Sequence, residues 1–424
     1  HNKIIKNFIS NLFKINLVSK LHLILFLSIK FFQLTKLLRN SVSHKKFNGK
    51  LIMTKTLVDY FVSLVKIDSE SKNEKEIALK LAEDLKNLGG EVRFDDANKK
   101  TGGNVGNLYA YFPGNIAKEP ILFCAHLDTV IPGNGVNPQI LEDRITSDGT
   151  TILGADDKSG IAQIIWAIKE LKNTKTAPIE VLFTISEEIG LLGAKYLDYS
   201  MIKSKIGFAL DTHKVGAVVI GAPFQNSMKF TIHGKEAHAG SSPEYGVNAI
   251  KIAAEAISKM PSGRIDNETT CNIGLISGGD ATNIVPNKVV IEAESRSHDK
   301  KKLMEISNKM KNAVLSAVQN YKLGDFSASV EVEIEEEYQA FRVDENAEIV
   351  KLGQNAAQKM DLNSYTIIGG GGSDVNIFNQ NGLQMVIVGT GMDAVHTVKE
   401  FIKINELKAG AEWVRNAILL YSEI

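Results

Sequence analysis

The sequence predicts an α/β protein whose chain is interrupted by a second, smaller α+β unit. In residues 53–221, helix-like segments alternate with short apolar segments typical of buried strands, as in layered α/β domains. Between residues 222 and 337 the order of predicted elements changes to βαββαβ, which is the ferredoxin-like arrangement. Alternating helices and strands return in residues 338–424. We therefore expect one α/β domain, built from both flanking segments, with the ferredoxin-like unit inserted into it.

The first segment, residues 53–221, begins with two predicted helices. Apolar residues at helical spacing from Leu57 to Val65 predict the first helix. Ser71 and Glu74 have the spacing of a capping box, which predicts the start of the second helix, and Gly89-Gly90 predicts its end. The pattern predicts later strands at 91–95, 107–112, 120–125, 179–185, 206–210 and 215–220, and helices at 159–172 and near 190–198.

The inserted unit and the final segment follow the same periodicity rules. In residues 222–337 the pattern predicts strands at 227–233, 271–277, 288–295 and 328–336, and helices at 246–260 and 299–322. In residues 338–424 it predicts helices at 344–359 and 399–421, strands at 364–368 and 384–388, and a glycine loop between these strands.

The distribution of charge separates the N-terminal stretch from the rest of the chain. The chain has 49 basic and 49 acidic residues, but residues 1–52 hold ten Lys and Arg and no Asp or Glu. Residues 53–424 therefore hold 39 basic and 49 acidic residues, a net charge of −10, which argues against nucleic acid as a partner. The two cysteines, Cys124 and Cys271, cannot form a disulfide framework and fit a reducing, cytoplasmic environment.

Residues 1–52 contain an apolar run, Leu21 to Ile29, between lysines. Lys30 ends this run well short of the ~20 residues that a membrane-spanning helix needs, and no small-residue cleavage site follows closely. The first methionine is Met53, and globular patterning starts just after it. We interpret residues 1–52 as an extension outside the functional fold, read through from upstream rather than native coding sequence. We expect no membrane association; a secreted or tethered form is the alternative.

The candidate chemistry begins in the segment from Ile121 to Thr129, an apolar run that ends in His126 and Asp128. Side chains two residues apart point the same way along a strand, so this imidazole and carboxylate can act together. Further acidic residues and a histidine lie where predicted strands end or helices begin, and ligand sites collect at such strand ends. These residues are Asp156, Glu187, Glu188, Asp211 and His396. Taken alone, each is more typical of a cap, a turn or a surface charge.

Eight motifs in a fixed order carry a more specific signal. They are Cys-Ala-His126-Leu-Asp128-Thr, Gly-Ala-Asp156-Asp-Lys-Ser-Gly, Ser-Glu187-Glu188-Ile-Gly, Leu-Asp211-Thr, His-Gly-Lys-Glu-Ala-His238-Ala-Gly, Thr-Asn283-Ile-Val-Pro, Glu-Ser-Arg296-Ser-His-Asp and Gly-Met-Asp-Ala-Val-His396-Thr. Together they resemble the dinuclear zinc peptidases of the M20 metallopeptidase family, and within it the peptidase T-like (tripeptide aminopeptidase) branch. The resemblance runs from about Lys55 to the C-terminus.

The resemblance implies a site for two zinc ions. Asp156 would bridge them, His126 and Asp211 would complete one site, and Glu188 and His396 would complete the other. Imidazole nitrogen and carboxylate oxygen are suitable zinc ligands. Manganese or cobalt could occupy the same ligands, so the native metal stays open.

The resemblance also implies roles for residues beside these ligands. Glu187 would be the general base that takes a proton from the attacking water and delivers it to the leaving amine. Asp128 would accept a hydrogen bond from His126 and so orient that ring. The peptide bond between Asp156 and Asp157 is cis in the family, and we expect the same here.

The inserted unit matches the family's lid. His238, Asn283 and Arg296 match lid positions that contact the substrate or the oxyanion in family members. Arg296 suits a bidentate hold on a peptide carboxylate; a surface salt bridge is the alternative. His238 reaches the neighbouring subunit's site in dimeric members, which makes a homodimer an expectation. Gly371 and Ser373 match a position near the metal site and substrate.

The resemblance therefore implies a zinc-exopeptidase-like catalytic domain, a mixed sheet flanked by helices, with an inserted lid and dimerisation domain. The implied activity is metal-dependent hydrolysis of short peptides, as in an aminopeptidase acting on tripeptides. Asp211 favours this branch, because many deacylase branches carry Glu there. The alternatives are another amidohydrolase of the family, such as a carboxypeptidase or an N-acyl-amino-acid deacylase, and a metal-binding protein without catalysis. Glu187 argues against the last, since a structural site needs no free base beside a ligand.

Overall fold

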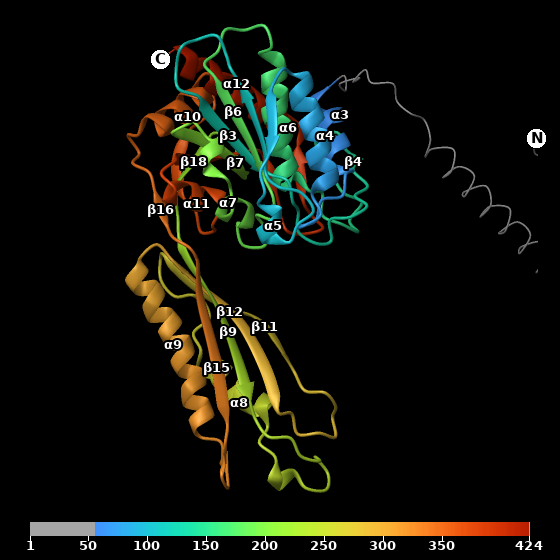
Figure 1. The fold of residues 1–424 in the computed structure, drawn as a ribbon, viewed down its shortest axis with the longest axis vertical. Coiled ribbons are helices and arrows are strands. Elements are labelled where there is room, and N and C mark those ends of the chain that lie inside the picture. Colours follow the sequence, from blue (N-terminus) through green and yellow to red (C-terminus); the bar gives the residue numbers. More distant parts are fainter. Residues whose placement is uncertain (1–55, 424) are drawn as a thin grey trace, which may run out of the picture. The chain divides into compact units, whose positions relative to one another are not determined.

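The computed structural model describes residues 56–423, so the expectations for residues 1–52 lie outside the described residues. In the described part, most strands belong to two larger sheets, one of nine strands and one of five (Figure 1). No helix of this part is long and apolar enough to cross a membrane.

The nine-stranded sheet is mixed. Its strands, in order across the sheet, are β1 (Glu91–Phe94), β2 (Leu108–Phe112), β6 (Ile179–Thr184), β3 (Ile121–His126), β7 (Ile206–Thr212), β18 (Gln384–Gly389), β8 (Ala217–Ala222) and β16 (Phe341–Arg342), and β17 (Tyr365–Ile368) also pairs with β8. The central strands β6, β3, β7 and β18 run parallel, and the pairs nearer the β1 edge are antiparallel. Every residue of β3 and β6 is buried, which explains why both strands are largely apolar.

Helices flank this sheet (Figure 1). They are α3 (Leu57–Val65), α4 (Lys75–Asn87), α6 (Ala155–Glu170), α10 (Glu348–Gln358), α11 (Asp374–Gln380) and α12 (Ile404–Glu423), with the short α5 (Asn98–Thr101) and α7 (Leu192–Lys195) in loops. Helix α6 packs on β3 and β7, and α3 and α12 pack on α6. In the core, Trp413 of α12 meets Phe208 of β7 edge to face, with ring centroids 4.9 Å apart. The first and final segments therefore share one hydrophobic core.

The five-stranded sheet is antiparallel and has its own core. Its order is β10 (Gly263–Arg264), β11 (Thr269–Gly278), β12 (Lys288–Ser297), β9 (Phe224–His233) and β15 (Ser329–Tyr338). Helices α8 (Ala249–Lys259) and α9 (Lys300–Gln319) pack on it, and Phe230, Ile252, Ile291 and Val314 lie in the core between them. The chain order β9-α8-β11-β12-α9-β15 is the βαββαβ order that the sequence predicts.

Several short elements escaped prediction because they lack a periodic pattern. Strands β4 (Gln139–Ile140), β5 (Arg144–Thr146), β19 (Met392–Asp393) and β20 (Phe401–Lys403) form a small sheet, and β13 (Lys322–Leu323) pairs with β14 (Phe326–Ser327). The predicted helix at 399–421 begins later, at Ile404, because Phe401 to Lys403 pair with β5. Strands of two or three residues are too short to show an alternation.

The capping box expected from Ser71 and Glu74 is wrong. Helix α4 begins at Lys75, and no side chain caps it. The Ser71 hydroxyl donates instead to Oδ2 of Asp128 at 2.6 Å, and Glu74 accepts the backbone N–H of Ser186 at 3.0 Å. Both side chains bind partners that lie far along the chain, because the buried polar groups of Asp128 and Ser186 need hydrogen bonds.

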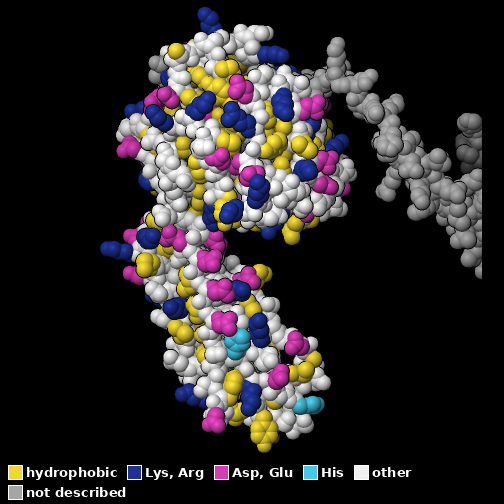
Figure 2. Space-filling model, in the orientation of Figure 1, with side chains coloured by type: hydrophobic (Ala, Val, Ile, Leu, Met, Phe, Trp, Pro, Cys, Tyr) yellow, Lys and Arg dark blue, Asp and Glu magenta, His cyan; other side chains and the backbone are white. Residues whose placement is uncertain are grey.

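On the face shown in Figure 2, Lys and Arg side chains are interspersed with Asp and Glu side chains. This face of the described residues carries no continuous basic surface.

Candidate functional site

The central strands end at one edge of the nine-stranded sheet and bring the predicted residues there. His126 is the last residue of β3, Asp211 lies near the end of β7, and Asp156 lies in the first turn of α6. Glu188 follows β6, and His396 follows β19. The peptide bond between Asp156 and Asp157 is cis, as expected. Parallel strands place their carboxyl ends at the same edge, which gathers residues that lie far apart in the sequence.

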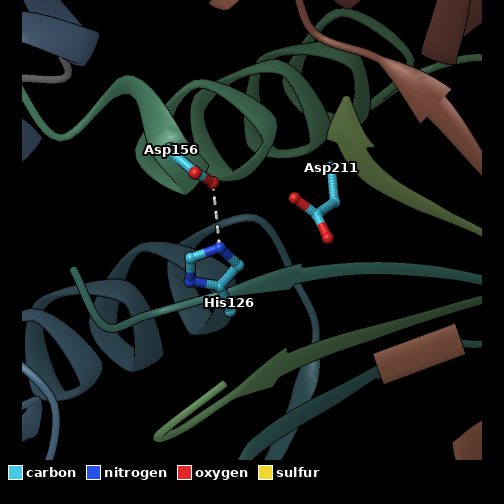
Figure 3. Close-up of side chains that lie close together, drawn as sticks. All are labelled: His126, Asp156 and Asp211. Carbon is cyan, nitrogen blue, oxygen red and sulfur yellow. Dashed lines mark hydrogen bonds and ion pairs between the residues drawn. The ribbon is translucent and has the colours of Figure 1, made fainter. Parts of the chain in front are cut away.

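Asp156 lies between the two histidines. Its Oδ1 is 3.0 Å from Nε2 of His126, and its Oδ2 is 3.2 Å from Nε2 of His396. Oε2 of Glu188 lies 3.0 Å from the same nitrogen of His396. Figure 3 shows that the carboxylate of Asp211 points into the space that His126 and Asp156 face. One carboxylate therefore joins two groups of potential ligands.

Three groups of side chains in the described residues could hold a metal ion, each with donor atoms within 4.8 Å of one another. Two share Asp156: one with His126 and Asp211, the other with Glu188 and His396. A third joins His126, Glu187 and Glu188. All five predicted ligands are thus brought together. Glu187 lies close enough to His126 that geometry alone does not separate it from the ligands.

Asp128 accepts the expected hydrogen bond from His126, but through its backbone carbonyl rather than its carboxylate. Nδ1 of His126 donates to the backbone carbonyl of Asp128 at 2.9 Å, whereas the carboxylate lies 3.6 Å from this nitrogen, too far for a hydrogen bond. The carboxylate accepts the backbone N–H groups of Glu187 and Glu188, at 2.9 and 3.2 Å, and the Ser71 hydroxyl. Asp128 therefore orients the ring through its main chain and holds the glutamate loop through its side chain.

Glu400 is a buried residue of the site that the motifs did not reveal. Its Oε2 accepts the backbone N–H groups of Leu153 and Gly154 at 2.7 and 2.8 Å, and its Oε1 accepts that of Asp156 at 2.9 Å. One carboxylate thus fixes the turn that presents Asp156. The signal in the sequence was an acidic residue four positions after His396.

Burial and repulsion between carboxylates set the protonation of the site. Burial, together with neighbouring carboxylates, raises the pKa of Glu187 and of Asp211. The pKa of Asp156 is lowered, because its contacts with His126 and His396 outweigh its burial. Contacts with Asp156 and Glu188 raise the pKa of His396 to about 10.

This donor set fits divalent metal ions. Four carboxylates, those of Asp156, Glu187, Glu188 and Asp211, converge on two imidazoles, and burying so much negative charge without cations is costly. Oxygen and nitrogen donors arranged around one shared carboxylate are a chemistry that zinc and similar ions accept.

A pocket of about 730 Å³ opens beside these residues, and both sheets line it. Among the predicted substrate-binding residues, Arg296, Gly371 and Ser373 line the pocket. Arg296 forms a bidentate ion pair with Glu294, with nitrogen to oxygen distances of 3.1 and 3.0 Å. The salt bridge left open as the alternative therefore forms, but at the pocket wall.

Gln225 and Tyr338, from the neighbouring strands β9 and β15, extend this wall. Gln225 donates to Glu294 at 3.1 Å, and the Tyr338 hydroxyl donates to Gln225. Neither residue could be predicted from the sequence, because their approach depends on the register between β9 and β15.

His238 and Asn283 are not among the described residues that line the pocket. Both are exposed in the five-stranded unit, where the backbone N–H of Ala239 donates to the carbonyl of Asn283 at 2.9 Å. Within one chain, the predicted substrate-binding residues therefore form two groups, one at the pocket and one away from it.

Comparisons with known proteins agree on a family. The model of peptidase family M20/M25/M40 matches residues 122–420. An uncharacterised protein of Bacillus subtilis strain 168, YqjE, is 44% identical over 367 residues, which cover 86% of this chain and 98% of that protein.

Two solved structures are also similar. Aminopeptidase PepT from Bacillus cereus ATCC 10987 has 43% sequence identity and a TM-score of 0.74, covering 85% of this chain and 97% of the other. A tripeptidase from Staphylococcus aureus subsp. aureus Mu50 has 38% identity and a TM-score of 0.80, covering 87% and 98%. The family model spans the residues that form the candidate site, from the end of β3 to His396. The chain belongs to peptidase family M20 and is a peptidase, a hydrolase of peptide bonds.

Proposed function

We propose that this protein is a metal-dependent aminopeptidase that removes the N-terminal residue from tripeptides and similar short peptides. The observation that carries the proposal is the position of Asp156, whose two carboxylate oxygens face His126 and His396. The likeness to an aminopeptidase and a tripeptidase, at 43% and 38% identity, supports the substrate class.

Two zinc ions are the proposed cofactors. His126, Asp156 and Asp211 would hold one ion, and Asp156, Glu188 and His396 the other. Bound at such a site, two ions polarise a peptide carbonyl and lower the pKa of a water towards ~7. Manganese or cobalt would suit the same donors. Metal analysis of the purified protein, with the activity restored by each ion after chelation, identifies the native metal.

Glu187 is the proposed general base. Its side chain lines the pocket beside the donor groups, and burial raises the pKa of its carboxyl. It would accept a proton from the attacking water and pass it to the nitrogen of the leaving amine. The carboxylate of Asp128, which accepts the backbone N–H of Glu187, would fix the loop while this transfer takes place.

Arg296, Gly371 and Ser373 would bind the peptide. Arg296 presents a planar guanidinium suited to a carboxylate. A Cβ atom placed on Gly371 would lie 3.6 Å from Nη1 of Arg296. The glycine loop therefore runs close to the arginine at the pocket wall. In this proposal the peptide carboxylate competes with Glu294 for Arg296.

We further propose that residues 222–337 form a lid and dimerisation domain, and that residues 53–221 and 338–424 form the catalytic domain. His238 and Asn283 would then complete the site of a neighbouring subunit. Exposed apolar side chains in the same unit support a homodimer: Leu275, Ile276 and Ile284 are 65%, 53% and 40% exposed. The cytoplasm is the proposed compartment, which the two free buried cysteines suit.

A mixing experiment tests the contribution of a second subunit. His238→Ala and Glu187→Gln variants, each inactive alone, should regain part of the activity when mixed. The Glu187→Gln subunit would supply His238 to a site whose own Glu187 is intact. Light scattering should give the mass of a dimer, and a monomeric, fully active protein would exclude the arrangement.

Substrate profiling tests the reaction itself. Metal-loaded protein should release the N-terminal residue from free tripeptides and leave N-acetylated amino acids intact. Hydrolysis of only the N-acetylated compounds would identify a deacylase, and release of the C-terminal residue would identify a carboxypeptidase. Two bound metal ions without cleavage of any amide would indicate a metal-binding protein.

A further inference from the structure

Three consecutive backbone N–H groups in the loop after β6 donate to buried carboxylates. Those of Glu187 and Glu188 donate to Asp128, at 2.9 and 3.2 Å. The N–H of Ser186 donates instead to Oε1 of Glu74 at 3.0 Å, and the Ser186 hydroxyl reaches the same oxygen at 3.1 Å. Two acidic side chains therefore hold the segment that carries the proposed base.

Glu74 reaches this loop from a distant part of the sequence. It directly precedes α4, and its side chain is fully buried. Its Oε1 also accepts the backbone N–H of Lys72 at 2.8 Å, whereas its Oε2 has no hydrogen-bond partner in the described part of the chain. Because α4 gains no side-chain cap from Glu74, helix initiation does not account for this buried acid. Apart from the bond to Lys72 close by in the sequence, the hydrogen bonds of its side chain among the described residues are the two with Ser186.

Ser186 has a backbone conformation that needs support. Its φ is 53°, in the left-handed region that residues other than glycine adopt rarely. Such a conformation persists where surrounding groups enforce it, and it often lies at functional sites. Glu74 receives both polar hydrogens of Ser186, so it is well placed to enforce this turn. This turn therefore determines the direction in which the side chain of Glu187 leaves the backbone.

We propose that Glu74 is a positioning residue for catalysis, which fixes the backbone of Ser186 and thereby places Glu187 in the pocket. This inference rests on the proposed function, in which Glu187 is the base. Glu74 does not belong to the described residues that line the pocket, so it acts through Ser186 rather than on the substrate. A displacement of ~1 Å at a reacting group can lower the rate about 100-fold. The effect should fall on kcat rather than on KM.

The test compares variants of Glu74 with a matched control in the metal-loaded full-length protein. Glu74→Ala removes the acceptor, and Glu74→Gln keeps a carbonyl oxygen for Ser186 while placing its amide at the unpartnered oxygen. The control is Glu180→Ala. Glu180 is fully buried on β6 and likewise accepts backbone N–H groups, from Lys203 and Ser204 at 2.9 and 2.8 Å, but away from the site.

We expect Glu74→Ala to lower kcat about 10- to 100-fold with unchanged KM and metal content. Glu74→Gln should recover most of kcat, and Glu180→Ala should lower the melting temperature without lowering kcat. Equal loss of kcat in Glu74→Ala and Glu180→Ala would reduce the role of Glu74 to general stability and overturn the proposal. A loss in Glu74→Gln as large as that in Glu74→Ala would also overturn it, because the acceptor is retained.

Two further measurements keep the test decisive. If Glu74→Ala does not fold, Glu74→Asp replaces it, since the shorter side chain withdraws the carboxylate from Ser186; wild-type kcat in a folded Glu74→Asp variant would refute the proposal. Glu187→Gln separates this inference from the proposed function. An active Glu187→Gln enzyme removes the proposed base itself, whereas an inactive one beside a fully active Glu74→Ala enzyme refutes only the role of Glu74.

Discussion

Replacing Glu187 by Gln should abolish turnover and leave the metal content of the protein intact. The change keeps the shape of the side chain and removes only its ability to take a proton. General base catalysis contributes about 10²- to 10⁴-fold to the rate, which corresponds to about 2.7–5.4 kcal/mol of activation free energy at 1.36 kcal/mol per tenfold. We therefore expect kcat to fall at least 100-fold.

The structure supplies the matched comparison at the next residue. Glu188 lies 3.0 Å from Nε2 of His396, whose ring also faces Asp156. Glu188→Gln should therefore lose metal as well as activity, and excess metal should restore part of the rate. Glu187 lacks such a contact with His396, although it lies near His126 in one of the three groups of potential ligands.

Metal analysis after dialysis, combined with tripeptide kinetics in saturating metal, distinguishes the two glutamates. Loss of metal from Glu187→Gln and retention by Glu188→Gln would show that the base and the ligand are assigned the wrong way round. Retained activity in Glu187→Gln at full metal loading would refute a proton-transfer role for this residue.

Further predictions concern the supports of the site and its charge. Glu400→Gln should weaken metal binding about 10- to 100-fold, because one oxygen can no longer accept the N–H groups around Asp156; unchanged affinity in a chelator competition would contradict this. Burial raises the pKa of Asp374 and of Glu400 to about 7. The folded metal-free protein thus binds more protons than the unfolded chain between about pH 4 and 7. Its stability should therefore decrease as pH rises through this range, and added metal should restore it. A melting temperature that rises with pH instead would show that these two carboxyl groups do not control the stability of the metal-free protein. Arg296→Lys should raise KM for tripeptides about tenfold in steady-state kinetics, because lysine cannot make the bidentate contact with the peptide carboxylate. An unchanged KM would show that Arg296 serves only as the partner of Glu294.

The regular elements could be predicted from the sequence because their burial is uniform or periodic. β3 and β6 are buried throughout and are largely apolar, while the helices show one apolar face. Helix α11 could not be predicted from periodicity because it has only seven residues, although Ser373 and Asn376 form a capping box at its start. The capping-box pattern directly follows a run of four glycines, which predicts a loop at the same place.

The polar groups of the site were predicted less evenly. The ligand residues lie at strand ends, where topology forces them together. Ser71 and Glu74 misled local reasoning, because their spacing fits a helix cap and their actual partners lie far along the chain. The side chain of Asp128 accepts hydrogen bonds from the glutamate loop, whereas its backbone carbonyl accepts the one from His126. No motif encodes this division.

The contacts of Asp156 also bear on when the enzyme becomes active during synthesis. His396 and Glu400, which contact Asp156 or its backbone, both lie within residues 396–424. Ribosomes add residues in order, and the N-terminal parts of a chain begin to fold first. A nascent chain that has not yet gained these residues therefore lacks the second imidazole and the carboxylate that fixes the turn of Asp156. The ligand set around Asp156 is therefore completed late in synthesis, after the strands that carry its other members.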